Sequence, residues 1–143
     1  MNMVELTMYK AKKYGRNEWI YGWLILVDYR FAIMRDTLKW SDDGSSFLAD
    51  IDSWDFVEGN TIHIGSPFLD DNDTRIYDGD IVASDDVRYV VSYDDGVFFV
   101  TGRVGEETKK LLLFDLMHKS LDGVKIIGNK HDDFDAYMNI LHQ

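Results

Sequence analysis

Residues 80–101, with the sequence DIVASDDVRYVVSYDDGVFFVT, decide the fold class of this chain. The stretch holds runs rich in Val, Tyr and Phe, which favour strands, at Asp80 to Ser84, Val87 to Tyr93 and Val97 to Thr101. Short polar turns separate the runs. The second turn, Asp94-Asp95-Gly96, places a glycine where a hairpin needs a positive φ. Residues 80–101 therefore predict an antiparallel meander.

The central strand of this meander has one face that is more apolar than the other, because side chains alternate along a strand. The apolar face, which we expect to pack on the core, consists of Val87, Tyr89, Val91 and Tyr93. The opposite face consists of Arg88, Val90 and Ser92.

The N-terminal part of the chain predicts a hairpin followed by less regular structure. Strands are expected at Val4 to Ala11 and Trp19 to Val27, with the turn residues Tyr14-Gly15-Arg16-Asn17 between them. Residues 41–46, SDDGSS, predict a polar loop. The segments that flank this loop fit a short strand or a helix equally well, and they are Phe31 to Leu38 and Phe47 to Ile51.

The remaining segments predict further strands and one helix. Strands are expected at Thr61 to Ile64, Leu111 to Leu116 and Val124 to Ile127, with a turn at Asp70-Asp71-Asn72-Asp73. A helix is expected over His131 to Gln143, because apolar residues recur there at helical spacing, namely Phe134, Tyr137, Met138 and Leu141. Short strands with frequent turns favour a small barrel or sandwich.

Length and composition limit the class of protein. A chain of 143 residues with 45% hydrophobic residues is expected to fold as a single domain over residues 1–143. It has no cysteine, no apolar run typical of a signal peptide and none long enough to span a bilayer, so we expect a protein of the cytoplasm that makes no membrane contact. The formal net charge of −11 disfavours direct binding of nucleic acid, since such binding requires a local basic patch.

Three stretches carry a resemblance to a known family. The most specific is Arg75-Ile76-Tyr77-Asp78-Gly79-Asp80-Ile81-Val82, which follows the pair Thr61-Ile62 and the polar turn. The other two stretches are the opening hairpin, Tyr9 to Lys12 with Glu18 to Gly22, and the closing segment Ile126-Ile127-Gly128-Asn129. Together they resemble the YopX family of phage and prophage proteins. His63 and Ile64 depart from the glycine and glutamine common in that family, and the usual turn glycine is missing.

The resemblance implies a mainly β, barrel-like fold with little helix, in a bacterial or phage setting, and it implies no activity. With the helix predicted over His131 to Gln143, we expect a small antiparallel barrel-like domain with a short C-terminal helix. We expect the shared residues to be structural, because a glycine at position 79 permits a bend and the Asp80 carboxylate can accept backbone N–H groups there. The residues in question are Thr61, Ile62, Ile76, Tyr77, Gly79, Asp80, Ile81, Val82, Ile127, Gly128 and Asn129.

No motif in the sequence predicts a catalytic, metal or cofactor site. The acidic residues at positions 70–80 fit a solvated turn better than a calcium loop, because Arg75 and Ile76 occupy the middle of the run. The four histidines lie far apart, and none has a partner at metal-ligand or triad spacing. We therefore expect no catalytic residue, no bound metal and no cofactor.

An aromatic stripe is the one candidate interface. Trp19, Tyr21 and Trp23 alternate along the second predicted strand, and either core packing or partner binding explains such a stripe. The leading hypothesis for function is a protein-interaction module that binds an unknown host or phage protein, or a second copy of the chain. The alternatives are an acidic mimic of nucleic acid that blocks a DNA-binding protein, and a ligand-binding barrel or enzyme whose site comes from residues distant in sequence.

Overall fold

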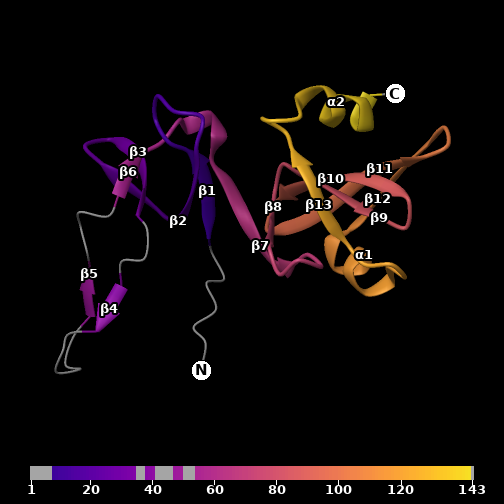
Figure 1. Ribbon diagram of the computed structural model, residues 1–143, viewed down its shortest axis with the longest axis horizontal. Helices are drawn as coiled ribbons and strands as arrows, with labels where there is room; N and C mark the ends of the chain where they lie inside the picture. The colour runs from indigo at the N-terminus through magenta and orange to yellow at the C-terminus, as the bar shows by residue number, and fades with distance from the viewer. Residues whose placement is uncertain (1–7, 35–37, 41–46, 50–53, 143) are drawn as a thin grey trace. The chain divides into compact units, whose positions relative to one another are not determined.

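The computed structural model describes residues 8–34, 38–40, 47–49 and 54–142 of the chain. The chain divides into two compact units, Met1–Ile64 (unit 1) and Gly65–Gln143 (unit 2). Figure 1 colours the chain continuously by residue number, from indigo at the N-terminus to yellow at the C-terminus. The prediction of a mainly β fold with a short C-terminal helix is confirmed. The prediction of one domain over residues 1–143 stays a prediction.

Unit 1 is built on antiparallel strands in the order β6-β3-β2-β1-β7. The bounds of the strands are β1 Tyr9–Lys12, β2 Trp19–Val27, β3 Arg30–Met34, β6 Trp54–Phe56 and β7 His63–Leu69, of which β7 pairs with β1 through His63 and Ile64. A short 3-10 helix, Gly59–Thr61, precedes β7. A further pair joins β4, Leu38–Trp40, to β5, Phe47–Ala49.

The predicted N-terminal hairpin is confirmed in unit 1 from Tyr9 onward. Residues 4–7 of its first strand and the predicted loop at 41–46 lie outside the described residues. The flanks of that loop, for which strand and helix were both open, contain the strands β3, β4 and β5. The small core of the unit consists of Ala11, Ile20, Ile33 and Val57.

Unit 2 contains the predicted meander within a sheet of order β12-β11-β10-β9-β13. The bounds are β9 Asp80–Ser84, β10 Val87–Asp94, β11 Val97–Val104, β12 Glu107–Leu112 and β13 Lys125–Asn129. Besides this sheet, β8, Arg75–Tyr77, pairs with the second half of β7. The meander is confirmed because β10 pairs antiparallel with β9 on one side and with β11 on the other.

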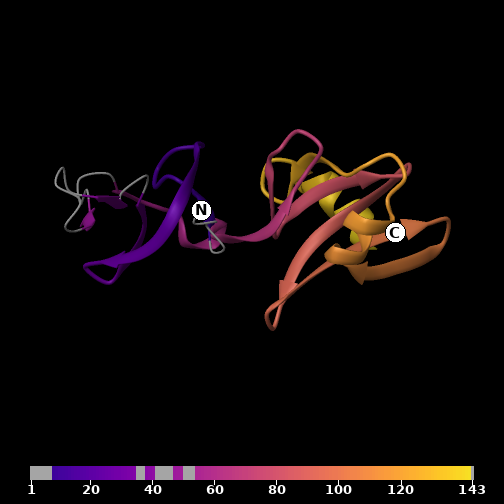
Figure 2. The same cartoon turned by 90° about the horizontal axis from the view of Figure 1, so that it is seen from below.

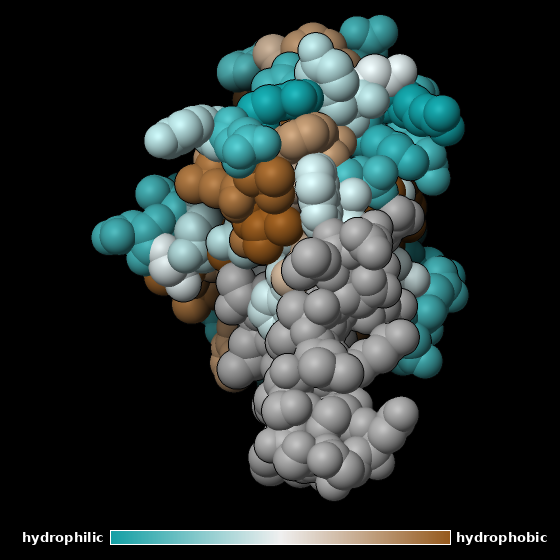
Figure 3. Space-filling model, turned by 90° about the vertical axis from the view of Figure 1, so that its left-hand side faces the viewer, coloured by the Kyte–Doolittle hydropathy of each residue, from teal (hydrophilic) through white to brown (hydrophobic). Residues whose placement is uncertain are grey.

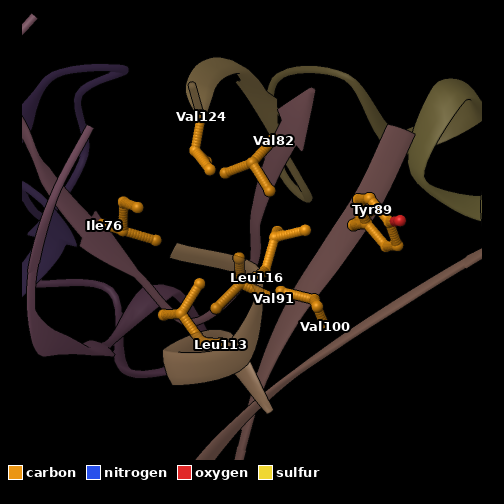
Figure 4. Close-up of a cluster of buried hydrophobic side chains, with 8 residues drawn as sticks. All are labelled: Ile76, Val82, Tyr89, Val91, Val100, Leu113, Leu116 and Val124. Carbon is orange, nitrogen blue, oxygen red and sulfur yellow. The ribbon is translucent and has the colours of Figure 1, made fainter. Parts of the chain in front are cut away.

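Two helices cover opposite faces of the five-stranded sheet, as Figures 1 and 2 show. Helix α1, Leu113–Lys119, packs Leu113 and Leu116 against one face. The core formed there, drawn in Figure 4, consists of Ile76, Val82, Tyr89, Val91, Val100, Leu113, Leu116 and Val124. Helix α2, Phe134–His142, packs Ile140 against Ile81 and Val90 on the other face.

The second helix explains why the expected alternation in β10 is only partly right. Tyr89 and Val91 are buried on the predicted face, but Val90 is buried too, because α2 covers the opposite face. Tyr93, at the end of the strand, is exposed. The strand is therefore apolar on both faces where helices flank it.

Two apolar segments have a structure that differs from the predicted one. Leu111 to Leu116 is not one strand: β12 ends at Leu112 and α1 begins at Leu113, since a helical turn places Leu113 and Leu116 together in the core. The predicted stripe of the C-terminal helix is also wrong at Phe134, which is 54% exposed. The buried side of α2 instead consists of Ala136, Tyr137, Ile140 and Leu141.

The expected barrel-like closure is not found. In the described part of the chain, β12 pairs only with β11, and β13 pairs only with β9, so the sheet of unit 2 stays open. Helices on both faces bury the apolar side chains that a barrel would enclose, which removes the need for closure.

The described residues include no helix with the length and apolar character needed to cross a bilayer.

Gly102 of β11 is a position where a side chain does not fit. A Cβ atom there would lie 2.6 Å from Cδ1 of Tyr89 and 2.7 Å from the carbonyl oxygen of Arg88. We predict that Gly102→Ala lowers the free energy of unfolding by about 1–3 kcal/mol, because the ring and a strand must both move. Urea denaturation measures this, with Gly59→Ala as the control, since a Cβ at Gly59 meets nothing within 4 Å. Equal stability of the two variants would contradict the prediction.

Candidate functional site

The Gly79-Asp80 segment forms a turn that joins β8 to β9. Asp80 is buried, at 2% exposure, and its Oδ2 accepts the backbone N–H of Tyr77 at 2.8 Å. Gly79 has a φ of +83°, donates its N–H to the carbonyl oxygen of Val91 and accepts the N–H of Lys130, both at 2.8 Å. These contacts explain the glycine and the aspartate as parts of the fold.

The apolar residues of the same segment lie in the cores of unit 2. Ile76 and Val82 belong to the cluster under α1, and Ile81 belongs to the cluster under α2. Tyr77 is buried as well. The segment thus contributes to both faces of the sheet.

Asp70 begins the polar turn and is an acceptor for three backbone N–H groups. Its Oδ1 accepts Asn72 and Thr74, each at 2.9 Å, and its Oδ2 accepts Ile126 at 3.1 Å. Burial by itself would raise the pKa of this carboxyl, but the N–H groups of Ile126, Thr74 and Asn72 outweigh it and hold the pKa below its ordinary value. Asp70 therefore joins its turn to β13 as an ionised group.

The neighbouring Asp71 strengthens the same junction. Its backbone N–H donates to the carbonyl oxygen of Val124 at 2.9 Å, and its Oδ1 accepts the N–H of Val124 at 3.3 Å. A Cβ on Gly123 would collide with the Asp71 carboxylate, which explains the glycine beside it. Asp70 and Asp71, two of the acidic residues clustered in this part of the sequence, are thus acceptors of backbone N–H groups.

Two further turns use the same chemistry. Oδ1 of Asp85 accepts the N–H of Asp122, while Oδ1 of Asp122 accepts the N–H of Asp85. The pKa of Asp85 is lowered, first by its side-chain contact with Asp122 and then by the backbone N–H groups of Asp122 and Leu121. The pairing of Asp85 with Asp122 was not predicted, because the two turns are 37 residues apart and only the tertiary fold brings them together.

The Gly128-Asn129 segment leads from β13 into α2. Oδ1 of Asn129 accepts the N–H groups of His131 and Asp132, both at 3.0 Å. Oδ2 of Asp133 accepts the N–H of Asn129, and a Cβ on Gly128 would lie 2.5 Å from that oxygen. Ile127 is at the irregularity in β13 and is exposed.

The Thr61-Ile62 pair has a local role in unit 1. The Thr61 hydroxyl donates to the carbonyl oxygen of Glu58 at 2.7 Å and accepts the N–H of Lys12 at 2.8 Å. Ile62 packs against the core of that unit.

The histidines occupy different elements. His63 lies on β7 with its ring centroid 6.3 Å from that of Trp19, and His118 of α1 places its Nδ1 2.8 Å from the carbonyl oxygen of Phe114. His131 precedes α2 and His142 ends it. Within the part of the chain that the structure describes, no three His, Asp or Glu side chains are grouped as a metal ion would require.

The predicted aromatic stripe lies on the side of β2 opposite the core of unit 1. Ile20 and Leu24 alternate with it and pack in the core, whereas Tyr21 is 48% exposed and Trp19 and Trp23 are half-buried. Figure 3 shows a hydrophobic patch beside hydrophilic side chains on one face of the molecule; on its hydropathy scale the Trp and Tyr rings of the stripe do not rank as hydrophobic.

Cations accompany these rings. The register pairs Lys10 with Tyr21 and Lys12 with Trp19, and the Nζ atoms of the two lysines lie 4.7 and 5.3 Å from the centre of the Trp19 ring. The register also places His63 beside Lys10. We call Lys10, Lys12, Trp19, Tyr21, Trp23 and His63 the aromatic face. Alternation along β2 predicts the stripe of rings but not the lysines, which the pairing of β1 with β2 places beside them.

Replacement of Asp70 tests its role as an acceptor. We predict that Asp70→Asn lowers the free energy of unfolding at neutral pH by about 1–3 kcal/mol, because an amide cannot satisfy all three N–H groups. The lowered pKa means that Asp70 stabilises the wild type above its unfolded pKa of about 4, and that this contribution is lost as the pH falls through the folded pKa.

The variant should therefore show a weaker loss of stability in acid than the wild type. Urea unfolding over a pH series measures both effects. Asp73→Asn is the control, since Asp73 is exposed in the same turn. An Asp70→Asn protein with wild-type stability and acid dependence would contradict the assignment.

Comparison with known proteins supplies a family and nothing more specific. The family model described as YopX protein matches residues 9–134, which includes parts of both units. No curated protein and no solved structure matches. Since the match extends over most of the chain, the protein belongs to the YopX family.

Proposed function

We propose that this YopX-family chain is a protein-interaction module, an accessory protein of a phage or prophage that acts in the bacterial cytoplasm by binding rather than by catalysis. Its partner is a host or phage protein, and the aromatic face of unit 1 is the contact surface. A second copy of the chain is the competing occupant of that surface.

The position of the aromatic face carries this proposal. Trp and Tyr side chains are usually placed in a core, yet here the aliphatic residues that alternate with them form it. Large rings with an exposed edge are typical of interface centres, where a hot-spot residue contributes about 2 kcal/mol or more. Lys10 and His63, which lie beside the rings, are themselves buried. Tyr21, the most exposed of the three rings, is the best candidate for such a residue.

The mimic hypothesis finds less support in the positions of the carboxylates. A mimic of nucleic acid needs an extended row of exposed charges, because the groove that it blocks recognises phosphates. Asp70 and Asp80 are buried, and Asp85 accepts backbone N–H groups. For an enzyme or a ligand-binding barrel, the described residues offer no constellation that argues in its favour.

Affinity capture from bacterial and phage-infected lysates, repeated over a salt series, tests the proposal. We predict a partner that is retained at high salt, because the contact is mainly apolar, and a loss of affinity of roughly ten-fold or more for Tyr21→Ala. Tyr29→Ala is the control, since Tyr29 is fully exposed at the β2–β3 turn. Binding must then be reproduced with the purified partner.

Each other outcome identifies a different function. A basic DNA-binding protein that is retained only at low salt supports mimicry, and a concentration-dependent dimer lost in Tyr21→Ala identifies a second copy as the occupant. Retention that is equal for Tyr21→Ala and Tyr29→Ala would contradict the assignment of the aromatic face.

A further inference from the structure

The basic residues of unit 2 are scattered in the sequence, and the sheet brings several of them together. Residues 65–143 contain eight Lys and Arg against sixteen Asp and Glu, so a basic patch is not evident along the chain. The strand register nevertheless pairs Arg88 with Ala83, and Ala83 with Lys125. Continuing the β10–β11 register by one residue from Tyr89 and Gly102 places Arg103 opposite Arg88.

These residues share one face of the sheet. Neighbouring strands lie about 4.8 Å apart, so Lys125, Arg88 and Arg103 form a row roughly 14 Å long across four strands. The face is the one that carries α2, because Val90 packs on that helix and residues 88 and 90 point to the same side. Arg88 and Lys125 are exposed, which shows that α2 does not cover this end of the face.

The row lacks acidic partners. Within the described residues, no carboxylate lies at ion-pair distance from Arg88, Arg103 or Lys125, and Arg103 donates only to the backbone oxygen of Glu106. The carboxylate of Asp85, at the same end of the sheet, is directed to the N–H groups of Leu121 and Asp122. Like charges placed directly opposite each other destabilise a sheet, so two adjacent arginines without a counter-ion favour an external anion.

An aromatic ring accompanies the row on the same face. Phe99 lies four residues from Arg103 along β11, and the Nζ of Lys110 lies 4.6 Å from the centre of its ring. Thr101 and Thr108 contribute hydroxyl groups nearby, since they pair with Lys110 and Arg103. Cations along a surface together with an aromatic ring are the components of sites for single-stranded nucleic acid.

We propose that the row Lys125–Arg88–Arg103, with Lys110 and Phe99, binds the phosphate backbone of a single-stranded nucleic acid. Arginine forms bidentate hydrogen bonds with phosphate and with carboxylate groups alike. The Phe99 ring, on which a base can stack, is the feature that favours a nucleic acid over an acidic peptide. The bases of a duplex are paired and stacked on each other and offer no free face to Phe99, so the row with its ring fits a single strand better.

The test uses the full chain and a labelled oligothymidylate of about 12 nucleotides, a length within the usual site size. Fluorescence anisotropy between about 50 and 200 mM salt should show binding whose log K falls with log[salt] with a slope of about −2, as expected for three phosphate contacts. Arg88→Ala, alone and with Arg103→Ala, should weaken binding ten-fold or more. The control is Arg16→Ala with Lys119→Ala, which removes exposed cations outside the row.

Circular dichroism first establishes that the variants fold. If the arginine variants do not fold, Lys125→Ala replaces them as the test of the row. Three results would overturn the proposal: no oligonucleotide binding at about 50 mM salt, equal binding by the row and control variants, or duplex bound as tightly as single strand. Binding of an oligo-aspartate peptide in place of the oligonucleotide would also overturn it, and would identify an acidic protein segment as the ligand.

Discussion

The fold of unit 2 depends on a buried carboxylate that accepts backbone hydrogen bonds from two parts of the chain. Asp70 binds two N–H groups of its own turn and one of β13, which is 56 residues further along. β13 is the last strand of the sheet and leads to α2, so this contact helps to place the helix that covers the second face. A buried polar group is tolerated here because its hydrogen-bonding capacity is satisfied.

The same chemistry recurs at Asp80, Asp85 and Asp133, and it accounts for much of the acidic character of the turns. At Asp80 and Asp133 the short side chain reaches backbone N–H groups three and four residues away. Asp85 instead reaches those of a second turn, 36 and 37 residues further along. The acidic composition that first suggested a metal or a mimic is in this part of the chain a property of the fold. Binding is then more naturally sought on the sheet faces than at the acidic turns.

The strands of the hairpin at β1–β2 and of the meander could be predicted because alternating apolar runs and turn residues are local signals. The start of α1 could not, since Leu111 to Leu116 is apolar throughout and only the tertiary packing of Leu113 and Leu116 distinguishes helix from strand. The open sheet was not predicted either, because whether a set of strands closes into a barrel depends on which strands pair in the tertiary structure. A short C-terminal helix was expected, but its packing over Val90 does not follow from its sequence.

In the candidate sites, too, the features that depend on local sequence could be predicted, and those that depend on tertiary structure could not. The role of Asp80 follows from its place after a glycine in a turn, and the aromatic stripe follows from alternation. The cations beside the rings and the basic row across β13, β10 and β11 depend on which strands are neighbours, and register is a tertiary property. Residues separated by up to 37 positions form the row, so no window of sequence contains it.

The central claim is that the aspartates of the family segment and its turns are structural acceptors, which leaves the sheet faces for binding. Carbon-13 NMR titration of the Asp70 carboxyl group in the folded protein tests it most directly. The account predicts a pKa clearly below the ordinary value of about 3.9, because three N–H groups outweigh the effect of burial. A pKa at or above that value would show that the carboxylate is not held by these hydrogen bonds, and would return Asp70 to the list of candidate functional groups.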